Sequence, residues 1–141
     1  MVWWFQGSKK SKPNNDYGHS QIIKRISKFV KDNPKKSILV DSLGQQKYYS
    51  LIKYVRFVSG NSSSLLYEVP LFKKISLNIG IRQLGRTRNH SVINSKANIK
   101  DIENKMIIID KKITNFKNFK NIFFKKNPTD LALKVIRLAC K

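Results

Sequence analysis

Arginine side chains offer the clearest chemistry in this sequence. Arg82, Arg86 and Arg88 lie close together, and no acidic residue occurs between Glu68 and Asp101 to compete for them. A guanidinium presents a planar fork of N–H donors that matches phosphate oxygens, and it stays charged at every relevant pH. The pattern therefore predicts phosphate contacts in this segment.

Positive charge extends along the whole chain. The 141 residues include 29 Lys and Arg against 8 Asp and Glu, for a net charge of +21. Residues 1–50, 51–110 and 111–141 carry +7, +6 and +8, so the excess is not confined to one tail. Such a charge repels itself in a free compact monomer and favours a polyanionic partner. Nucleic acid is the first candidate, and an anionic membrane surface is the second.

The predicted phosphate contacts include residues from all three segments. They are Lys9, Lys10, Lys12, Arg56, Lys73, Lys74, Arg82, Arg86, Arg88, His90, Lys96, Lys117 and Lys120. Two of these lysines belong to residues 116–126, where phenylalanines alternate with Lys and Asn. Those phenylalanines could stack on bases or pack in a core. A merely solvated basic surface is the alternative interpretation of the whole set.

Enzymatic chemistry has little support in the sequence. The two histidines, His19 and His90, have no carboxylate nearby in sequence to orient them. The single cysteine, Cys140, excludes an internal disulfide and a thiolate metal cluster. No glycine-rich phosphate loop of the P-loop kind and no paired metal ligands occur. We therefore expect no catalytic residue, no metal, no cofactor and no small-molecule substrate.

Hydrophobic spacing predicts a mixture of helices and strands. Residues 20–32 place apolar side chains at helical spacing opposite four basic ones, and Asn33-Pro34 ends this amphipathic helix. An aromatic and β-branched run at 47–58 predicts a strand. Five apolar residues at the start are too few for a membrane span, so no integral membrane segment is expected. The other expected elements are a strand at 37–40, a helix with Phe72, Ile75 and Ile79 on one face, strands at 84–92 and 106–109, a short helix carrying Ile99 and Ile102 behind Asn94 or Ser95, and a final helix after Asn127-Pro128.

One segment resembles a known family. Residues 77–87 read Leu-Asn-Ile-Gly-Ile-Arg-Gln-Leu-Gly-Arg-Thr, which is similar to Leu-x-Leu-Gly-Leu-Arg-x-x-x-x-Thr of the large-subunit ribosomal protein thirty family. Phe57–Gly60 resembles the end of that family's first strand, and Asn98–Ile102 and Met106–Ile109 resemble its second helix and last strand. The resemblance covers residues 51–110. It implies a small ferredoxin-like β-α-β-α-β layer, with three antiparallel strands and two helices, bound to large-subunit rRNA.

The expected fold class is therefore α+β, with helical extensions at both ends. Residues 1–50 form a basic N-terminal extension, 51–110 the ribosomal-protein-like core, and 111–141 a basic C-terminal extension that ends in a helix. The expected function is that of a structural constituent of the large ribosomal subunit, in contact with rRNA and neighbouring ribosomal proteins. The Lys, Asn and Ile bias indicates an organelle-encoded protein of a mitochondrial ribosome, with a bacterial or plastid ribosome as the alternative. A standalone RNA-binding or assembly factor and a basic peripheral membrane subunit of an organellar complex remain open.

Overall fold

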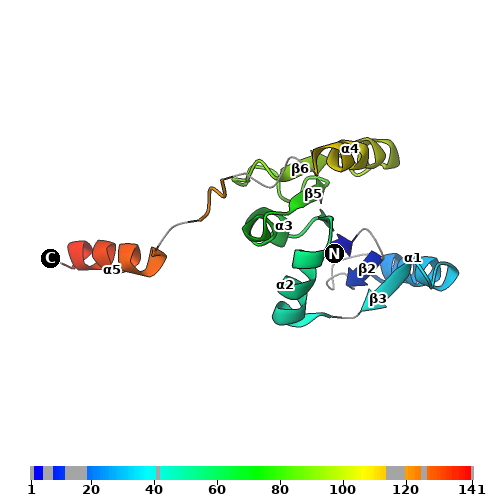
Figure 1. The fold of residues 1–141 in the computed structure, drawn as a ribbon, viewed down its shortest axis with the longest axis horizontal. Coiled ribbons are helices and arrows are strands. Elements are labelled where there is room, and N and C mark those ends of the chain that lie inside the picture. The colour runs from blue at the N-terminus through cyan, green and yellow to red at the C-terminus, as the bar shows by residue number, and fades with distance from the viewer. Residues whose placement is uncertain are drawn as a thin grey trace.

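The computed structural model describes residues 2–4, 8–11, 19–40, 42–113, 120–124 and 127–140 (Figure 1). Within them, helices cover a mixed sheet of strand order β3-β2-β1-β4-β5-β6. The elements are β1 (Val2–Trp4), β2 (Ser8–Ser11), α1 (His19–Asp32), β3 (Ser37–Val40), α2 (Gly44–Tyr54), β4 (Phe57–Gly60), α3 (Ser64–Tyr67), the 3-10 helix η1 (Val69–Phe72), β5 (Ile75–Ile79), β6 (Val92–Ser95), α4 (Ile99–Lys112) and α5 (Pro128–Ala139).

Strands β4, β5 and β6 are parallel neighbours. Val58 pairs with Ser76, and Leu77 pairs with Ile93. On the other side of β4, strand β1 is antiparallel to both β4 and β2, and β2 is parallel to β3. The ferredoxin-like layer expected for residues 51–110 has three antiparallel strands, whereas the three strands found there all run in one direction. The expected division at residue 50 falls inside α2.

Two apolar clusters sandwich the parallel strands. Val58 packs with α2 and α3 on one face, whereas Phe57 and Leu77 pack with Ile109 of α4 on the other. Figure 1 shows α4 on one side of β5 and β6, with α3 on the other. Consecutive residues of β4 are thus buried on opposite faces, as expected for a strand inside a layered α/β structure.

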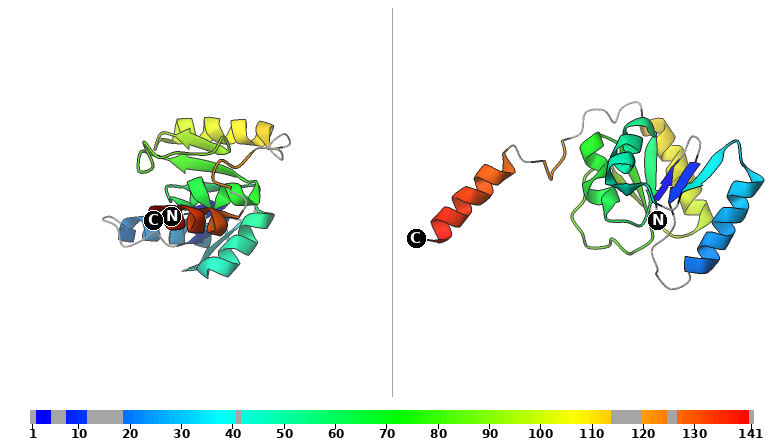
Figure 2. Two further views of the ribbon diagram at one scale, coloured as in Figure 1. Left: turned by 90° about the vertical axis from the view of Figure 1, so that its left-hand side faces the viewer. Right: turned by 90° about the horizontal axis from the view of Figure 1, so that it is seen from below.

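Four predicted elements are confirmed: α1, β3, α5 and the helix carrying Ile99 and Ile102, which is α4 and extends to Lys112. In α1, Ile26 is buried while the lysines of the opposite face are exposed. Helix α5 begins at Pro128, although the Asn127 side chain forms no capping hydrogen bond. Figure 1 and the right-hand view of Figure 2 show α5 apart from the sheet, and each residue from Asn127 to Cys140 is exposed.

The strand predicted at 47–58 is wrong, because most of this run belongs to α2. Tyr48, Ile52 and Val55 recur at helical spacing, and all three belong to the cluster that α2 and α3 form against the sheet. Aromatic and β-branched residues favour strands only weakly, so burial along one helix face outweighs that preference.

The helix predicted around Phe72, Ile75 and Ile79 is also wrong. Lys73 adopts a left-handed conformation with φ of 54°, which ends η1, and β5 follows. Within β5, Ile75 and Leu77 alternate with the buried polar side chains of Ser76 and Asn78. The spacing of Ile75 and Ile79 is therefore compatible with the two-residue period of a strand as well as with the period of a helix. Pairing within the sheet determines that a strand forms.

The remaining two strand predictions also fail. Residues 84–91 are turns and irregular structure between β5 and β6, and residues 106–109 lie in α4. The cap of α4 is Asn98 rather than Asn94 or Ser95, because Asn98 Oδ1 accepts a hydrogen bond from Asp101 N at 2.9 Å. No helix within the described ranges is long and apolar enough to cross a membrane.

Candidate functional site

The carboxyl ends of three parallel strands meet at one edge of the sheet. Residues 61–64 follow β4, residues 80–83 follow β5, and Lys96 follows β6. We call these residues the carboxyl edge. Ligands of open α/β sheets bind outside the carboxyl ends of the parallel strands, where loops can present polar groups without disturbing the core. The carboxyl edge is therefore the place to look for a binding site.

The loop after β4 is rich in hydroxyl groups. Ser62, Ser63 and Ser64 are half-buried, and the Ser62 and Ser63 carbonyls accept the first hydrogen bonds of the α3 turn. Tyr48 of α2 forms a hydrogen bond with Ser64 through their hydroxyl groups. Burial raises the pKa of Tyr48 to about 12, so the phenol stays neutral at physiological pH. Ser64 N–H donates to Ser62 Oγ at 3.3 Å. The loop thus presents hydroxyl groups, which are suitable donors to phosphate oxygens.

The loop after β5 bends sharply and places one side chain inward. Gly80 and Gly85 have φ of 81° and 78°, a backbone conformation that is strained for residues with a side chain. Between them, Arg82 is exposed, whereas Gln83 is buried. Gln83 Nε2 donates a hydrogen bond of 2.8 Å to the backbone carbonyl of Asn61. This bond joins two loops that are separated by about twenty residues of sequence.

The end of β6 is fixed by the start of α4. Asp101 Oδ2 accepts hydrogen bonds from Lys96 N at 2.7 Å and from Ser95 Oγ at 3.1 Å. The hydrogen bond that the backbone N–H of Lys96 donates is the main reason why the pKa of the Asp101 carboxyl group lies below its usual value. Asn78 Nδ2 also donates to Asn94 Oδ1 at 3.0 Å, which ties β5 to β6. These bonds hold the Lys96 backbone at the carboxyl edge.

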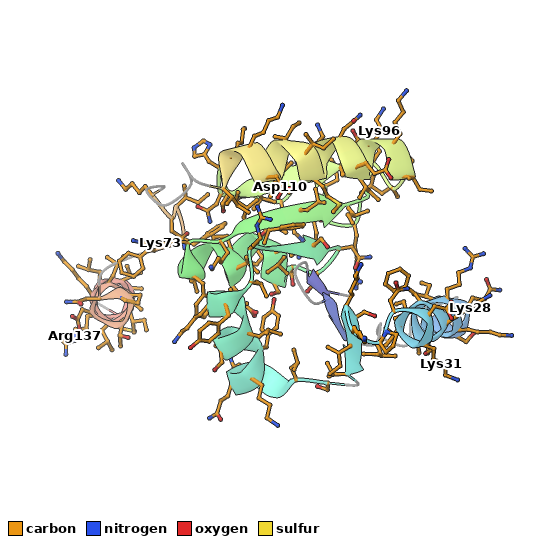
Figure 3. All side chains as sticks on the ribbon, turned by 45° about the vertical axis from the view of Figure 1, so that its right-hand side comes forward. Lys28, Lys31, Lys73, Lys96, Asp110 and Arg137 are labelled. Carbon is orange, nitrogen blue, oxygen red and sulfur yellow. The ribbon has the colours of Figure 1, made fainter. Side chains whose placement is uncertain are left out.

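The predicted phosphate-binding residues divide between the two edges of the sheet. Arg82 and Lys96 follow strands and lie at the carboxyl edge, whereas Arg56, Lys73 and Lys74 precede strands. Figure 3 shows Lys73 and Lys96 at opposite ends of the sheet. Among the residues at the amino ends of the strands, Arg56 forms a salt bridge, because its Nη2 lies 3.0 Å from Asp110 Oδ1. The two groups are therefore separated by the length of the strands.

The other predicted residues are spread along the chain. Arg86 is exposed in the loop after β5, and Arg88 and His90 are exposed closer to the start of β6. Lys120 is exposed beside Asn121, whose side-chain oxygen accepts from Asn89 Nδ2 at 3.0 Å. Lys9 and Lys10 contribute backbone to β2, and their side chains are not described; Lys12 and Lys117 lie outside the described residues.

Sequence reasoning missed the serine loop and Gln83. The serine loop is the segment Asn61-Ser62-Ser63-Ser64, and Gln83 is an uncharged residue between Arg82 and Leu84, so neither stands out by charge. A signal was present, since a short polar loop after a buried apolar strand is a common ligand-binding arrangement. Within the described residues, no group of His, Cys, Asp and Glu is arranged to hold a metal ion.

The fold and the carboxyl edge define an α/β protein with polar loops after its parallel strands. The family model for UDP-N-acetylglucosamine 2-epimerase matches residues 10–137, and the chain belongs to this family. The match includes the carboxyl edge and most of α5.

Several bacterial proteins are similar to this chain. The GDP/UDP-N,N'-diacetylbacillosamine 2-epimerase (hydrolyzing) of Campylobacter jejuni is 41% identical over 88 residues, which are 62% of this chain and 23% of that protein. The polysialic acid biosynthesis protein P7 of Escherichia coli is 33% identical over 126 residues, 88% of this chain and 32% of that protein. The UDP-N-acetylglucosamine 2-epimerase of Neisseria meningitidis is 33% identical over 90 residues, which are 64% and 23% of the two chains. The chain thus spans about a quarter to a third of the length of these curated relatives.

These matches correct the ribosomal interpretation. The assignment to the ribosomal protein thirty family, the structural role in a ribosome and the expected rRNA and ribosomal-protein partners are wrong, because the matching family and two of the three relatives are named as epimerases of sugar nucleotides. The expectations of a non-enzyme without a small-molecule substrate are overturned by the same finding. The mitochondrial location is also wrong, since the relatives are bacterial. The resemblance rested on residues 77–87, which form the end of β5 and its loop rather than the end of a helix and the start of a strand.

Proposed function

We propose that this chain provides the part of a sugar-nucleotide 2-epimerase that binds the diphosphate of a nucleoside-diphosphate amino sugar. The observation that carries the proposal is the joining of the serine loop to the Arg82–Gln83 segment at the carboxyl edge. The names of the relatives indicate the substrate class, because they specify UDP-N-acetylglucosamine and GDP- or UDP-linked diacetylbacillosamine.

The chemistry of the carboxyl edge suits two phosphate groups. The hydroxyl groups of Ser62 and Ser63 offer short-range donors, and the Arg82 guanidinium and Lys96 ammonium offer positive charge. Hydrogen bonds between charged donors and phosphate oxygens are about twice as strong as neutral ones. A mixed set of neutral and cationic donors therefore binds a diphosphate more tightly than a neutral nucleoside.

The carboxyl edge is better suited to binding than to proton transfer. Inverting carbon 2 of a sugar requires groups that remove and return a proton, and carboxylates or imidazoles usually do so. Residues 61–64, 80–83 and Lys96 contain neither group. We therefore assign to this edge the holding and orientation of the nucleotide sugar, and place proton transfer outside it.

Calorimetric titration of the purified chain tests the proposal. We expect affinity to fall in the order UDP, UMP, uridine, because each phosphate removed takes away charge-assisted contacts. Arg82→Ala should weaken UDP binding about 10- to 100-fold, which corresponds to about 1.5–3 kcal/mol for a bond to a charged group. Arg25→Ala on α1 removes the same charge away from the carboxyl edge and serves as the matched control. Equal affinities for UDP and uridine, or equal losses in the two arginine variants, would refute the proposal.

A further inference from the structure

We infer that Gln83 is a positioning residue: its side-chain amide holds the serine loop in the conformation that receives the diphosphate. The inference rests on the proposed function, because it gives Gln83 a role in that same site. It concerns a residue that is not itself required to touch the ligand.

The backbone around Gln83 is shaped to turn this one side chain inward. Ile81 and Leu84 are 82% and 74% exposed, whereas Gln83 is 3% exposed. The amide of Leu84 donates to the carbonyl of Ile81 at 2.9 Å, which closes a turn. Gly80 and Gly85 flank this turn with positive φ, so the chain can reverse on both sides of it. The polar Gln83 thus occupies an inward position between two apolar residues that face solvent.

The inward amide acts on the backbone of the serine loop. Gln83 Nε2 donates to the carbonyl of Asn61, the residue immediately after β4. Its other polar atom, Oε1, is buried and has no hydrogen-bond partner within the described residues. Leaving an acceptor unpaired in the interior is unfavourable. An apolar side chain would be more favourable at this position if packing were its only role. The hydrogen bond from Nε2 is therefore the contribution that requires an amide here.

A second hydrogen bond restrains the far end of the same loop. Tyr48 holds the Ser64 side chain while Gln83 holds the Asn61 carbonyl. Ser62 and Ser63 lie between these two restraints. Ordering a binding loop before the ligand arrives removes an entropic cost from binding. Gln83 therefore increases affinity for the diphosphate without contacting it.

The test compares UDP affinities of the full chain and its variants by calorimetry. Gln83→Met retains the approximate volume but removes the donor, and Gln83→Asn retains the amide but is too short to reach Asn61. Each should bind UDP about five- to tenfold more weakly, as expected for one lost hydrogen bond. Gln46→Met, at an exposed position in α2, is the matched control and should bind within about twofold of the unaltered chain.

A double-mutant cycle separates positioning from general stabilisation. If Gln83 acts through the serine loop, Gln83→Met in a Ser63→Ala background should lower affinity by less than about twofold, whereas independent sites would add fully. Full additivity, or unchanged UDP affinity in both Gln83 variants, would overturn the inference while leaving the proposed function intact. Absence of UDP binding by the unaltered chain would overturn the proposed function and this inference together.

Discussion

Replacing Ser76 by alanine removes the bond that ties β5 to α3. Ser76 has no exposed area, and its Oγ donates to the backbone carbonyl of Leu65 at 2.7 Å. Leu65 is also fully buried, so water cannot take the place of the lost hydroxyl without entering the core. Because α3 begins at Ser64, this bond also anchors the last residue of the serine loop.

The expected cost follows from the burial of the acceptor. A hydrogen bond contributes a net ~0.5–1.5 kcal/mol, and an acceptor left unpaired in the interior costs ~1–3 kcal/mol. We therefore predict that Ser76→Ala lowers the free energy of unfolding by about 2 kcal/mol. For a chain of this length, that loss corresponds to a decrease in Tm of roughly 8 °C. UDP binding should weaken as well, because the start of α3 loses a restraint.

Urea unfolding followed by far-UV circular dichroism measures this loss directly. Ser50→Ala makes the same change at an exposed position of α2 and should alter the unfolding free energy by less than about 0.5 kcal/mol. If Ser76→Ala were as stable as Ser50→Ala, the reasoning that the hydroxyl bond anchors α3 would be refuted.

Three further predictions concern the core and the two titratable groups beside the serine loop and β6. Leu77→Ala, which empties a fully buried position between β5 and α4, should cost about 2–5 kcal/mol of unfolding free energy in urea, whereas Leu133→Ala on the exposed α5 should cost less than about 0.5 kcal/mol. Burial raises the pKa of Tyr48 to about 12, so the stability it contributes is complete below the unfolded pKa near 10 and is lost as the pH rises through the folded value. Tyr48→Phe should abolish this alkaline loss in pH-dependent unfolding, and an unaltered chain that is equally stable across that window would contradict the assignment. The lowered pKa of Asp101 acts in the opposite sense: its contribution is present above about pH 4 and is lost as the pH falls through the folded value, so Asp101→Asn should show less acid-dependent loss of stability than the unaltered chain.

Local sequence signals correctly predict the elements whose hydrophobic pattern is compatible with only one type of secondary structure. Helix α1 has a single apolar stripe and ends at Asn33-Pro34, and α5 begins at a proline; both were predicted within one or two residues. The spacing of apolar residues around Ile52 and around Ile75 is compatible with a helix and with a strand. The packing partners determine which one forms, since Ile52 packs in the cluster of α2 and α3, whereas Ile75 packs in a strand against α4. Such a choice depends on contacts far apart in sequence.

The site was less predictable than the fold, because the topology creates it. Asn61 and Gln83 are distant in sequence and come together only because β4 and β5 are parallel and adjacent. Arg82 was selected for its charge and does lie at the carboxyl edge, whereas Arg56 was selected for the same reason and pairs with Asp110. A net charge of +21 indicates an anionic partner without specifying its size. The same charge is compatible with RNA and with the diphosphate of a nucleotide sugar.

The most direct test of the central claim is an NMR titration of the labelled chain with UDP-N-acetylglucosamine. If the carboxyl edge holds the diphosphate, the largest shifts in backbone amide resonances should occur at residues 61–64 and 80–83, with a smaller change at Lys96. Saturable shifts at those residues would support the account. Shifts concentrated on the basic face of α1 or around Lys73 and Lys74, with the serine loop unchanged, would contradict it.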